Sequence, residues 1–591
     1  MLDRITAAAA ETHFDFREHA APHDPLRHRF EEWVPYYRTK FAIAQVLAPR
    51  TILEIGVRYG YSAQAFLAAA PGARYLGLDS DSDTFGGSPG AIEWARARLA
   101  GRDAEVRVAD TQRLHRLPGD DWDLVHIDGQ QDGDGTFHDL GLALDCARWV
   151  LLDGLFWSAQ NMLSATMFLE RYRDRIGGAY IIPGYAGELL IESRKGRALR
   201  SDGATHEALR DAYTSDYFLA DCGGHESFRA YQGRRLVEPR QLVLHELGSP
   251  RRGMRVLDVG SGRGELCYAA WQSGAEVVGI DYAADAVSIA RRTYAASLGD
   301  RLRFVEGDAL EYEDAAGFDV IYAADVVEHL APAALDELLR KLTAWLRPGG
   351  RLLVHTWPNR LAYERQHRSR RAAAIAAGLY LPRSPRSRYE ELMHINEQTP
   401  ASLRRALRRS FPAVEIGLAR SAVPFEVVRA VADRQVLGTH DSLYAVAGSG
   451  VVGASFSALR QAALEPASVA PVSLRAEIPL AMRTAEDVEV PVHVDNRSGV
   501  RIGAFPPSPV NLSYRWYRDD EVVVADGIRT PLLPSLPAGT DRTYAATVRT
   551  PSEPGTYRLV VTLVQEGRFW FDSLSSSTSD AANVTVEPAT E

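Results

Sequence analysis

The chain has 591 residues, 46% hydrophobic and 24% charged, which is the composition of an ordinary water-soluble globular protein. Its formal net charge of −10 argues against a general nucleic-acid binder, which needs a basic surface to neutralise phosphates. Three cysteines in so long a chain cannot form a disulfide framework, and no apolar run approaches the roughly 18 residues of a membrane span. The length predicts about three or four domains. The acidic, broken start of residues 1–24 is unlike a signal peptide, so we expect a cytoplasmic protein.

The first predicted domain covers residues 48–195 and follows a polar leader, residues 1–47, whose second half has helical periodicity. Short apolar runs alternate in this domain with helical patterns. The alternation predicts an α/β fold with a parallel sheet and with ligands at the carboxyl ends of its strands. The predicted strands are residues 51–55, 74–78, 105–108, 124–127, 149–152, 180–182 and 188–191.

The most informative stretch is a predicted strand, residues 255–259, that breaks into three glycines and continues as a helix. A second strand, residues 276–280, ends in Asp281. Glycines allow the sharp turn and the close approach of a ligand, and a carboxylate in this place can accept both hydroxyls of a ribose. With Asp258 inside the first strand, the pattern D-x-G-x-G-x-G resembles motif I of class I S-adenosylmethionine (SAM)-dependent methyltransferases rather than a dinucleotide-binding fold.

The first domain carries the same landmarks in the same order. Glu54 pairs with Asp258, Asp79 with Asp281, Asp110 with Asp308 and Asp128 with Asp325, at offsets of 204, 202, 198 and 197 residues by subtraction of residue numbers. Four ordered matches at a nearly constant offset indicate two copies of one domain type, the first with the looser form E-x-G-x-x-x-G. The resemblance implies SAM on the glycine loop, its ribose on the acid after the second strand and its adenine near the acid after the third. The implied SAM-binding residues are Asp258, Gly260, Gly262, Gly264, Asp281 and Asp308 in the second copy and Glu54, Gly56, Gly60, Asp79 and Asp110 in the first.

The first copy also contains a D-G pair at Asp128, followed by Asp139. This segment resembles the D-G-x-H…D signature of metal-dependent O-methyltransferases that act on macrolide sugars and related glycosides. The resemblance implies that Asp128, with Asp153 after the next strand, holds a divalent cation such as Mg²⁺. Gln131 stands at the family's basic histidine and cannot take a proton, so His138 is the substitute base. The alternative is that Asp128 caps a strand and that this copy binds SAM without catalysis.

In the second copy, Asp325, Glu328 and His329 have the spacing of the E-x-x-E-H motif of ubiquinone-pathway O-methyltransferases, with Asp for the first Glu. The resemblance implies that these three residues hold a divalent cation beside the acceptor hydroxyl, where the cation lowers the hydroxyl pKa. The alternative is a metal-free site in which His329 is the base or serves only for packing. His394 lies in an H-x-N-x-x-T-P segment that walls the acceptor pocket in similar enzymes, and it is the second candidate base.

Two segments near this site have an ambiguous pattern. The aromatic residues of 213–231 resemble the lid of many sugar and quinone methyltransferases, and they are equally suited to burying the leading helix. The insertion of residues 357–400 is rich in arginine, which suits either a phosphate or pyrophosphate on a carrier-linked glycan or a solvated helix face. Its arginines are Arg360, Arg365, Arg368, Arg370, Arg371, Arg383, Arg386 and Arg388.

Helical patterns disappear after residue 470. Short alternating stretches separated by Pro, Gly and Asn/Asp turns predict an all-β, immunoglobulin-like sandwich. It resembles accessory sandwiches of bacterial polysaccharide proteins, which implies glycan binding, with dimerisation or docking as alternatives. Some of its aromatic residues could stack on sugar rings, although we expect most of them to be core: Phe505, Trp516, Tyr517, Phe569 and Trp570. The complete predicted organisation is a leader (1–47), a first methyltransferase domain (48–195), a connector and lid (196–250), a second methyltransferase domain (251–450), a linker (451–470) and the sandwich (471–591).

These resemblances together imply a SAM-dependent O-methyltransferase that acts on a sugar hydroxyl of a bacterial surface glycan or its lipid-linked precursor. They also imply peripheral association with a polysaccharide-assembly complex at the inner membrane face, with no nucleic-acid partner, and a homodimer is compatible with the sandwich. Two alternatives remain open. One is tailoring of a glycosylated natural product. In the other, the second copy is the only active methyltransferase and the first is a degenerate scaffold.

Overall fold

The computed structural model describes residues 1–84, 87–119, 121–194, 213–429, 433–450, 456 and 459–588. The chain divides into two compact units. Unit 1 comprises Met1–Ser201 and Gln366–Leu392, and unit 2 comprises Asp202–Arg365 and Met393–Glu591. Within the described residues, no helix is both long enough and apolar enough to cross a bilayer.

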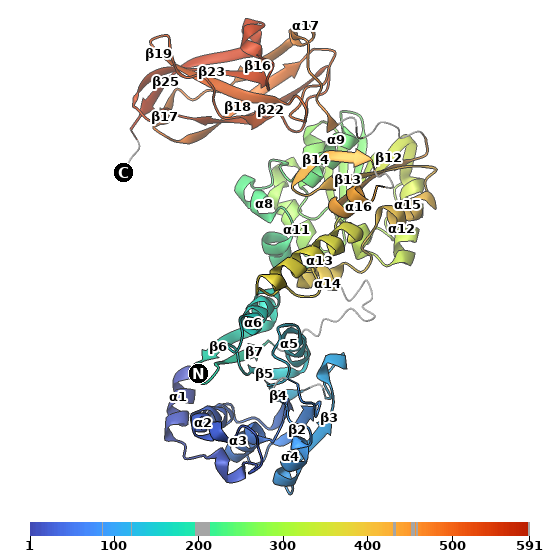
Figure 1. Ribbon diagram of the computed structural model, residues 1–591. Coiled ribbons are helices and arrows are strands. Elements are labelled where there is room, and N and C mark those ends of the chain that lie inside the picture. The colour runs from blue at the N-terminus through green and yellow to red at the C-terminus, as the bar shows by residue number, and fades with distance from the viewer. Residues whose placement is uncertain are drawn as a thin grey trace. The chain divides into compact units, whose positions relative to one another are not determined.

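Unit 1 is built on a sheet with the strand order β3-β2-β1-β4-β5-β7-β6 (Figure 1). The first five strands in this order pair in parallel, as the strand–helix alternation predicted, and β7 enters antiparallel between β5 and β6. Every strand predicted for this unit is present. The bounds are β1 Thr51–Ile55, β2 Arg74–Asp79, β3 Ala104–Val108, β4 Trp122–Ile127, β5 Ala147–Leu152, β6 Ile176–Ile182 and β7 Glu188–Ser193.

Helices cover both faces of this sheet. Ile43 of α2, Phe66 of α3 and Ala95 of α4 belong to the core on one face, and Leu142 of α5 and Phe168 of α6 belong to the core on the other. The sheet is therefore buried on both sides, which explains the apolar runs of its central strands. The helices are α1 Leu2–Glu11, α2 Phe30–Leu47, α3 Tyr61–Ala69, α4 Ala91–Leu99, α5 Asp134–Cys146 and α6 Ala159–Arg171, with 3₁₀ turns η1 Phe16–His19, η2 Arg27–Arg29, η3 Thr111–Arg113 and η4 Arg173–Arg175.

Residues 366–392, from the arginine-rich insertion, belong to unit 1. Arg371 Nη2 and Arg383 Nε both contact Oδ2 of Asp134, at 2.5 and 2.9 Å. The ring of Tyr380 lies 6.3 Å from that of Phe137. These two arginines are therefore engaged in internal ion pairs, which argues against the predicted role in phosphate binding for them. No sequence pattern predicted this packing, because the acid that pairs with them lies more than 200 residues away in the chain.

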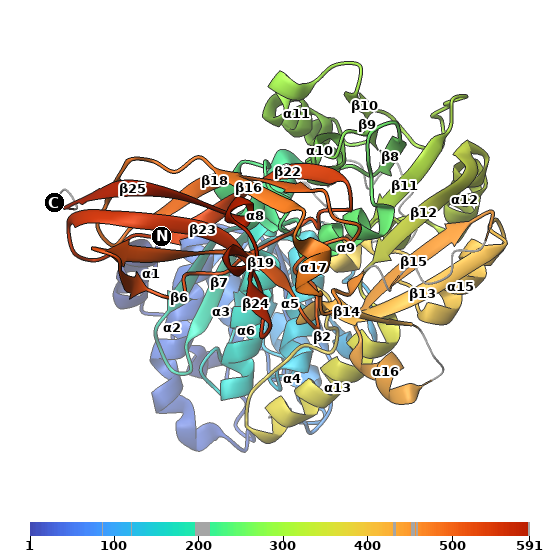
Figure 2. The same ribbon diagram turned by 90° about the horizontal axis from the view of Figure 1, so that it is seen from above.

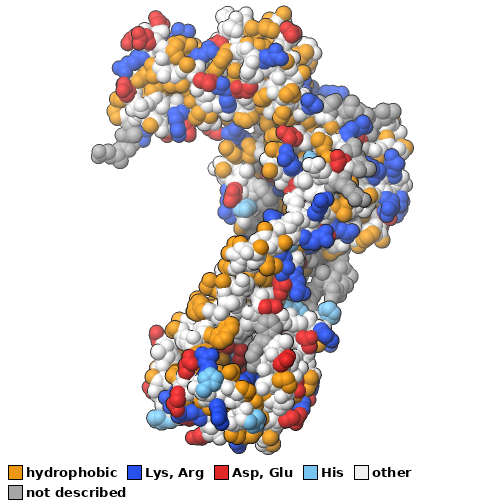
Figure 3. Space-filling view, viewed as in Figure 1, with side chains coloured by type: hydrophobic (Ala, Val, Ile, Leu, Met, Phe, Trp, Pro, Cys, Tyr) orange, Lys and Arg blue, Asp and Glu red, His pale blue; other side chains and the backbone are white. Residues whose placement is uncertain are grey.

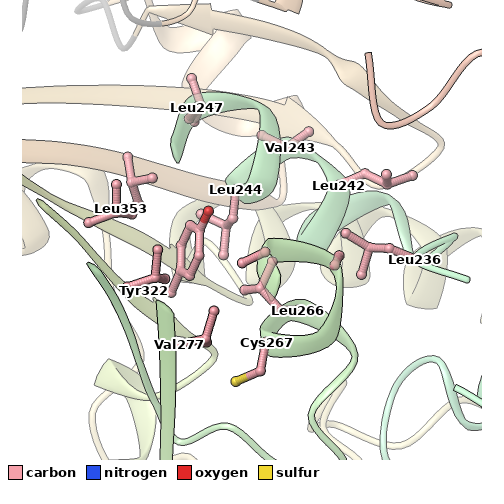
Figure 4. Close-up of a cluster of buried hydrophobic side chains, with 14 of the residues drawn as sticks. Leu236, Leu242, Val243, Leu244, Leu247, Leu266, Cys267, Val277, Tyr322 and Leu353 are labelled. Carbon is pink, nitrogen blue, oxygen red and sulfur yellow. The ribbon is translucent and has the colours of Figure 1, made fainter. Parts of the chain in front are cut away.

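The sheet of unit 2 has the order β10-β9-β8-β11-β12-β15-β13-β14. Up to β13 this is the order found in unit 1, with β15 antiparallel between β12 and β13. Helices α9, α10 and α11 cover one face through a core that includes Leu244, Tyr322 and Leu353 (Figure 4), and α12 and α15 cover the other. The strands are β8 Arg255–Val259, β9 Glu276–Asp281, β10 Leu302–Glu306, β11 Phe318–Ala324, β12 Leu346–Thr356, β13 Ala413–Arg420, β14 Val423–Arg429 and β15 Ser442–Gly448. The helices and turns are η5 Tyr217–Asp221, α8 His225–Tyr231, α9 Pro239–Gly248, α10 Glu265–Gln272, α11 Ala284–Thr293, η6 Ala295–Ser297, η7 Val327–His329, α12 Pro332–Trp345, α13 Arg360–Ala376, α14 Arg388–Met393, α15 Pro400–Arg408 and α16 Arg434–Thr439; α13 and α14 each contain residues of both units.

Residues 459–588, here called the β-domain, form two sheets that share one core (Figures 1 and 2). One has the order β16-β18-β22 and the other β17-β25-β23-β19-β20, and buried and exposed residues alternate along strands such as β18. On the face seen in Figure 3, acidic and basic side chains are interspersed over this domain. Its elements are α17 Pro466–Val469, β16 Val472–Ala476, β17 Ala481–Arg483, β18 Asp487–Asn496, β19 Val510–Arg518, β20 Glu521–Val524, β21 Thr530–Pro531, β22 Thr540–Arg549, β23 Gly555–Gln565, β24 Phe569–Trp570, β25 Ser579–Glu587, η9 Phe571–Ser573 and η10 Ser576–Thr578.

Some aromatic residues of the β-domain are unavailable to a sugar. Phe505 and Trp516 are fully buried. The ring of Trp570 is covered by the guanidinium groups of Arg515 and Arg529, whose carbons lie 3.9 and 5.0 Å from the ring centroid. Phe505 and Trp516 are therefore among the aromatic residues that serve as core, as expected for most of this set, and they cannot stack on a sugar.

Candidate functional site

The glycine loop of unit 2 joins β8 to α10 and is tied to β9. Gly260, Gly262 and Gly264 all have positive φ, at 70°, 52° and 88°, a conformation that glycine adopts without strain. The amide of Gly260 donates to the carbonyl oxygen of Ile280 at 2.9 Å. A Cβ on Gly260 would come within 2.7 Å of Cγ2 of Val326, so the loop has no room for a side chain there.

Asp281, the last residue of β9, lies against this loop. Its Oδ2 accepts a hydrogen bond from the amide of Gly262 at 2.8 Å, and its Oδ1 accepts one from the amide of Ala283 at 2.9 Å. Burial raises the pKa of Asp281 to about 6, and the two amides oppose this effect. A carboxylate has acceptor capacity beyond these two bonds, so this position fits the predicted ribose contact.

The other two predicted acids of this site differ in their surroundings. Asp258 is buried in β8 and accepts a hydrogen bond from Sγ of Cys267 at 3.2 Å, and burial raises its pKa to about 7. Asp258 lies beneath the glycine loop, and this position suits a residue that supports the loop. Asp308 is half-buried after β10, where its Oδ1 accepts from the amide of Leu310 at 2.8 Å.

The aromatic residues of 213–231, here called the aromatic leader of unit 2, pack over the glycine loop. Arg263 of the loop donates from Nη1 to the carbonyl oxygen of Phe218 at 2.6 Å and from Nη2 to that of Gly223 at 2.7 Å. Phe218 and Phe228 lie in one cluster with residues of α11. The hydroxyl of Tyr213 is 3.0 Å from Nδ1 of His329. The leader thus combines the two predicted roles, since it buries aromatic rings on the domain and also reaches the acceptor side.

Glu328, His329 and His394 form a cluster in which one ligand atom of each lies within 4.8 Å of the others. The segment that carries His394 is docked on η7, because the amide of Asn396 donates to the carbonyl oxygen of Glu328 at 2.9 Å. The rings of His329 and His394 meet edge to face with centroids 4.9 Å apart. The structure therefore brings together the two histidines that the sequence analysis treated as separate candidate bases.

Burial controls the charges in this cluster. It raises the pKa of Glu328 to about 8, an effect strengthened by the charge of Asp325. Burial, together with the charge of the neighbouring His394, lowers the pKa of His329 to about 3. His329 is consequently a neutral imidazole at neutral pH, the form that ligates a metal or accepts a proton.

Asp325 has a different partner from the one predicted. Its Oδ1 lies 2.6 Å from Nδ1 of His355 and its Oδ2 lies 3.7 Å from Nη1 of Arg240. Burial alone would raise the pKa of Asp325, but His355 and Arg240 hold it below its usual value. The metal-ligand geometry groups His394, not Asp325, with Glu328 and His329, so the predicted set is corrected in that member.

The glycine loop of unit 1 repeats these contacts. Oδ2 of Asp79 accepts from the amide of Arg58 at 2.8 Å, and Oδ1 accepts from the amide of Asp81 at 2.7 Å. Gly56 and Gly60 have φ of 85° and 77°. Asp110 accepts from the amide two residues later, as Asp308 does in unit 2.

A cavity of about 1080 Å³ opens beside this loop in unit 1. Its lining includes Asp79, Asp128, Asp153, Tyr36, Trp157 and Tyr185. Three of the predicted site residues, Glu54, Gly60 and His138, are not part of this lining. Glu54 is fully buried in β1, where it accepts hydrogen bonds from the hydroxyl of Tyr75 and from Nδ1 of His126, and burial raises its pKa to about 8. The position of Glu54 contradicts a direct contact with a cofactor.

His138 does not line this cavity either. Its Nε2 lies 3.0 Å from the carbonyl oxygen of Thr111, which fixes the imidazole on η3. The proposal that His138 replaces the missing family base has no geometric support. Asp139 is buried and accepts from Nε2 of Gln112 at 3.0 Å, and burial raises its pKa to about 7.

The sequence analysis did not anticipate the role of Lys40 of α2, which does not line the cavity itself but contacts Asp153, a residue that does. Lys40 is fully buried, and its Nζ contacts Nε2 of His126, Oδ1 of Asp153 and Oε1 of Glu188. Burial lowers the pKa of Lys40, but the neighbouring carboxylates raise it by more, so the pKa is raised overall. One signal was available: lysine occurs only three times in a chain whose other basic residues are arginines, so a retained lysine marks a place where a compact ammonium is needed.

Residues 256–350 match the family model described as a methyltransferase domain. This stretch contains the glycine loop, Asp281, Asp308, Glu328 and His329, whereas His394 lies beyond it. The chain contains a class I SAM-dependent methyltransferase domain. The assignment of the second predicted copy is thereby confirmed, while the assignment of unit 1 as another copy stays a prediction.

Two curated relatives are ubiquinone biosynthesis O-methyltransferases. The protein of Azorhizobium caulinodans is 37% identical over 108 residues, which is 18% of this chain and 42% of that protein. The protein of Sinorhizobium medicae is 35% identical over 177 residues, which is 28% of this chain and 66% of that protein. The chain thus spans less than two thirds of the length of these relatives.

Among solved structures, phosphoethanolamine N-methyltransferase 2 of Haemonchus contortus in complex with SAM aligns with a TM-score of 0.30 and 13% identity. The alignment covers 69% of this chain and 98% of that one. A TM-score this low supports no argument about this chain.

Proposed function

We propose that the chain is a SAM-dependent O-methyltransferase whose active site lies in unit 2. The observation that carries this proposal is the pairing of a cofactor site with an acceptor site on neighbouring strand ends. Asp281 and the glycine loop form the proposed cofactor site, and the cluster of Glu328, His329 and His394 forms the proposed acceptor site. The aromatic leader contacts both, through Arg263 and through Tyr213.

In the proposed reaction, the acceptor oxygen attacks the methyl carbon of the sulfonium as the carbon–sulfur bond breaks. An ether and S-adenosylhomocysteine form, and the hydroxyl proton leaves to a basic group of the cluster. Most of the rate enhancement comes from holding the two reactants in line in a site that excludes water. His329 and His394 are the residues placed to hold or accept that proton.

The cluster also fits a divalent cation, as the resemblance to ubiquinone-type enzymes implied. It offers one carboxylate and two imidazoles at mutual distances suited to a single ion, and burial keeps His329 neutral. A bound cation would lower the pKa of the acceptor hydroxyl. Glu328 would be the carboxylate ligand, and Thr356 Oγ1, which donates to its Oε2 at 2.8 Å, fixes its orientation.

For the acceptor, we propose a sugar hydroxyl of a bacterial surface glycan or of its lipid-linked precursor. Support comes from the D-G…D segment of unit 1, from its aromatic cavity and from the appended β-domain, proposed as an immunoglobulin-like sandwich. A cytoplasmic enzyme peripherally associated with polysaccharide assembly, as a monomer or homodimer, fits this substrate. The runner-up is a small glycosylated natural product, for which the β-domain would be unnecessary.

We also propose that unit 1 is a second copy of the methyltransferase domain. The shared strand order and the matching contacts of Asp79 and Asp281 support this proposal. A scaffold without SAM is the competing interpretation, and SAM titration of Asp281→Ala separates the two. Residual binding of one equivalent indicates a second functional SAM site, and loss of all binding indicates a scaffold.

Transfer of labelled methyl from SAM to glycan and lipid-linked sugar fractions of the source organism tests the proposed function. We expect labelling by the wild type and none by Asp281→Ala or Glu328→Gln. Label confined to small secondary metabolites would favour the runner-up. A protein that binds SAM but labels neither class would overturn the proposal.

A further inference from the structure

A fully buried ammonium, that of Lys40, lies behind Asp153, one of the residues that line the cavity in unit 1. Nζ of Lys40 is 2.8 Å from Nε2 of His126, 3.1 Å from Oδ1 of Asp153 and 3.2 Å from Oε1 of Glu188. An ammonium has three hydrogens and no acceptor; Lys40 hydrogen-bonds His126 and Asp153 and forms an ion pair with Glu188. Lys40 and His126 are fully buried, Glu188 is nearly so, and Asp153 alone of the four also faces the cavity, so the ammonium is held by fixed partners inside the unit.

The partners of Lys40 are fixed in turn. Because Lys40 donates to Nε2 of His126, the imidazole hydrogen resides on Nδ1, which faces Oε1 of Glu54 at 2.9 Å. On the cavity side, the hydroxyl of Tyr36 donates to Oδ1 of Asp153 at 2.8 Å. A relay of polar groups therefore runs from the interior of β1 and β4 to the carboxylate that faces the cavity.

This arrangement conflicts with a divalent cation at Asp128 and Asp153. A doubly charged ion held by Asp153 would stand next to the ammonium of Lys40 in a buried setting, where like charges repel strongly. Nε2 of Gln131 donates to Oδ1 of Asp128 at 3.2 Å, which uses further ligand capacity. The residues present thus do not fit the metal that the D-G…D resemblance implied.

Unit 2 also has a cation of its leading helix beside an aspartate, although that aspartate is Asp325, the counterpart of Asp128, whereas Lys40 contacts Asp153. Arg240 lies on α9, the helix that leads into β8, as α2 with Lys40 leads into β1. Its Nη1 is 3.7 Å from Oδ2 of Asp325, and Asp325 stands outside the group that suits a metal. In both units, a basic side chain of the helix that precedes the first strand lies beside a carboxylate that follows the end of a strand.

The wall of the cavity indicates the kind of ligand. The rings of Tyr36 and Tyr185 have centroids 5.6 Å apart, and those of Trp157 and Tyr185 6.2 Å apart. Trp157 keeps 57% of its surface exposed. Aromatic faces that pack against C–H groups, next to carboxylates that accept hydrogen bonds from hydroxyls, suit a ring with several hydroxyl groups.

We propose that unit 1 holds a second, metal-independent ligand site for a polyhydroxylated ring such as a sugar, in which the ammonium of Lys40 takes the place of a divalent cation. The site does not depend on methyl transfer in unit 2. Its aspartates accept ligand hydroxyls, and Lys40 holds Asp153 in position through a direct ion pair. The positive charge is supplied by the chain itself, so binding needs no free ion.

Two titrations of the full chain test the proposal, both in a Glu328→Gln/His329→Asn background that removes the cluster of unit 2. Calorimetry with Mn²⁺ should give no binding that depends on Asp128 or Asp153. Calorimetry with methyl glycosides of glucose, mannose and rhamnose should give binding by at least one of them. That binding should be unchanged by a chelator and at least tenfold weaker in Trp157→Ala and in Asp153→Asn.

Replacement of the ammonium gives an independent readout. Lys40→Met should lower Tm, and Mn²⁺ should restore part of the loss, whereas the Tm of the parent should not respond to Mn²⁺. If Lys40→Met does not fold, Lys40→Arg, which keeps the charge, should retain glycoside binding without Mn²⁺. Mn²⁺ binding that disappears in Asp128→Asn, glycoside binding that requires Mn²⁺, or no binding of any glycoside would each overturn the proposal.

Discussion

Asp281 accepts a hydrogen bond from the amide of Gly262 at 2.8 Å, and the same bond recurs between Asp79 and the amide of Arg58 at the same distance. In each unit the carboxylate after the second strand is thus tied to the loop after the first. The bond holds the loop in its positive-φ conformation, while other lone pairs of the carboxylate stay available to a ribose.

The pH dependence of SAM binding should follow Asp281. Burial raises its pKa to about 6, so the ionised form that accepts ribose hydroxyls predominates above pH 6 and is lost as the pH falls through 6. We expect the Kd for SAM to rise about tenfold between pH 7.5 and pH 5, since each pH unit below the pKa reduces the ionised fraction up to tenfold. Asp281→Asn should bind weakly at both values. An unchanged pH slope in this variant would assign the titration to another group.

The acceptor cluster should affect chemistry and not cofactor binding. His329→Asn and Glu328→Gln remove a group beside the acceptor and leave the Asp281 loop intact, so we expect kcat to fall by about 10²- to 10⁴-fold with the SAM Kd unchanged. Asp325→Asn should cost less than either, because Asp325 pairs with His355 outside the cluster. An equal loss of kcat in all three variants would mean that Asp325 acts together with Glu328 and His329, as the sequence analysis predicted.

The hydroxyl of Tyr213, in the aromatic leader, should affect the capacity of His329 to accept a proton. Tyr213→Phe removes the hydroxyl 3.0 Å from Nδ1 of His329 and leaves the ring in place. A single hydrogen bond contributes about 0.5–1.5 kcal/mol, so we expect a two- to tenfold fall in kcat. Tyr231→Phe is the matched control, since its ring lies under Arg235 at 4.5 Å and away from the cluster. A shift in the acid limb of the kcat–pH profile of Tyr213→Phe alone would distinguish tuning of His329 from a loss of packing.

Much of the fold was predictable because its signals are local. The strands β1 and β8 have the predicted bounds, since each is a short apolar run ended by a glycine whose positive φ stops the strand. The glycine loops and the acids Asp79 and Asp281 follow from spacing alone. Motif spacing also located Glu328 and His329.

What could not be predicted depends on contacts between distant residues. The pairing of Asp325 with His355 requires the registry of β11 against β12, and the pairs of Arg371 and Arg383 with Asp134 span more than 200 residues of chain. Lys40 meets Glu188 only because β7 inserts antiparallel beside β5. A pattern of residue types along the chain does not encode such contacts, although the rarity of lysine pointed to one of them.

The β-domain should be held to α9 by one buried acid, Glu246. Its Oε1 accepts from the amide of Ser535 at 2.5 Å, and Nη1 of Arg501 lies 3.3 Å from its Oε2. Glu246→Ala leaves a buried amide and a guanidinium without their acceptor, which should lower the free energy of unfolding by about 3 kcal/mol. Urea denaturation monitored by tryptophan fluorescence measures this loss. Arg235→Ala, which breaks an exposed pair with Glu489, is the control and should cost less than about 1 kcal/mol. Equal losses in the two variants would mean that the β-domain is held by its apolar contacts, such as Phe505 against Phe425 with ring centroids 5.4 Å apart, and not by the buried acid.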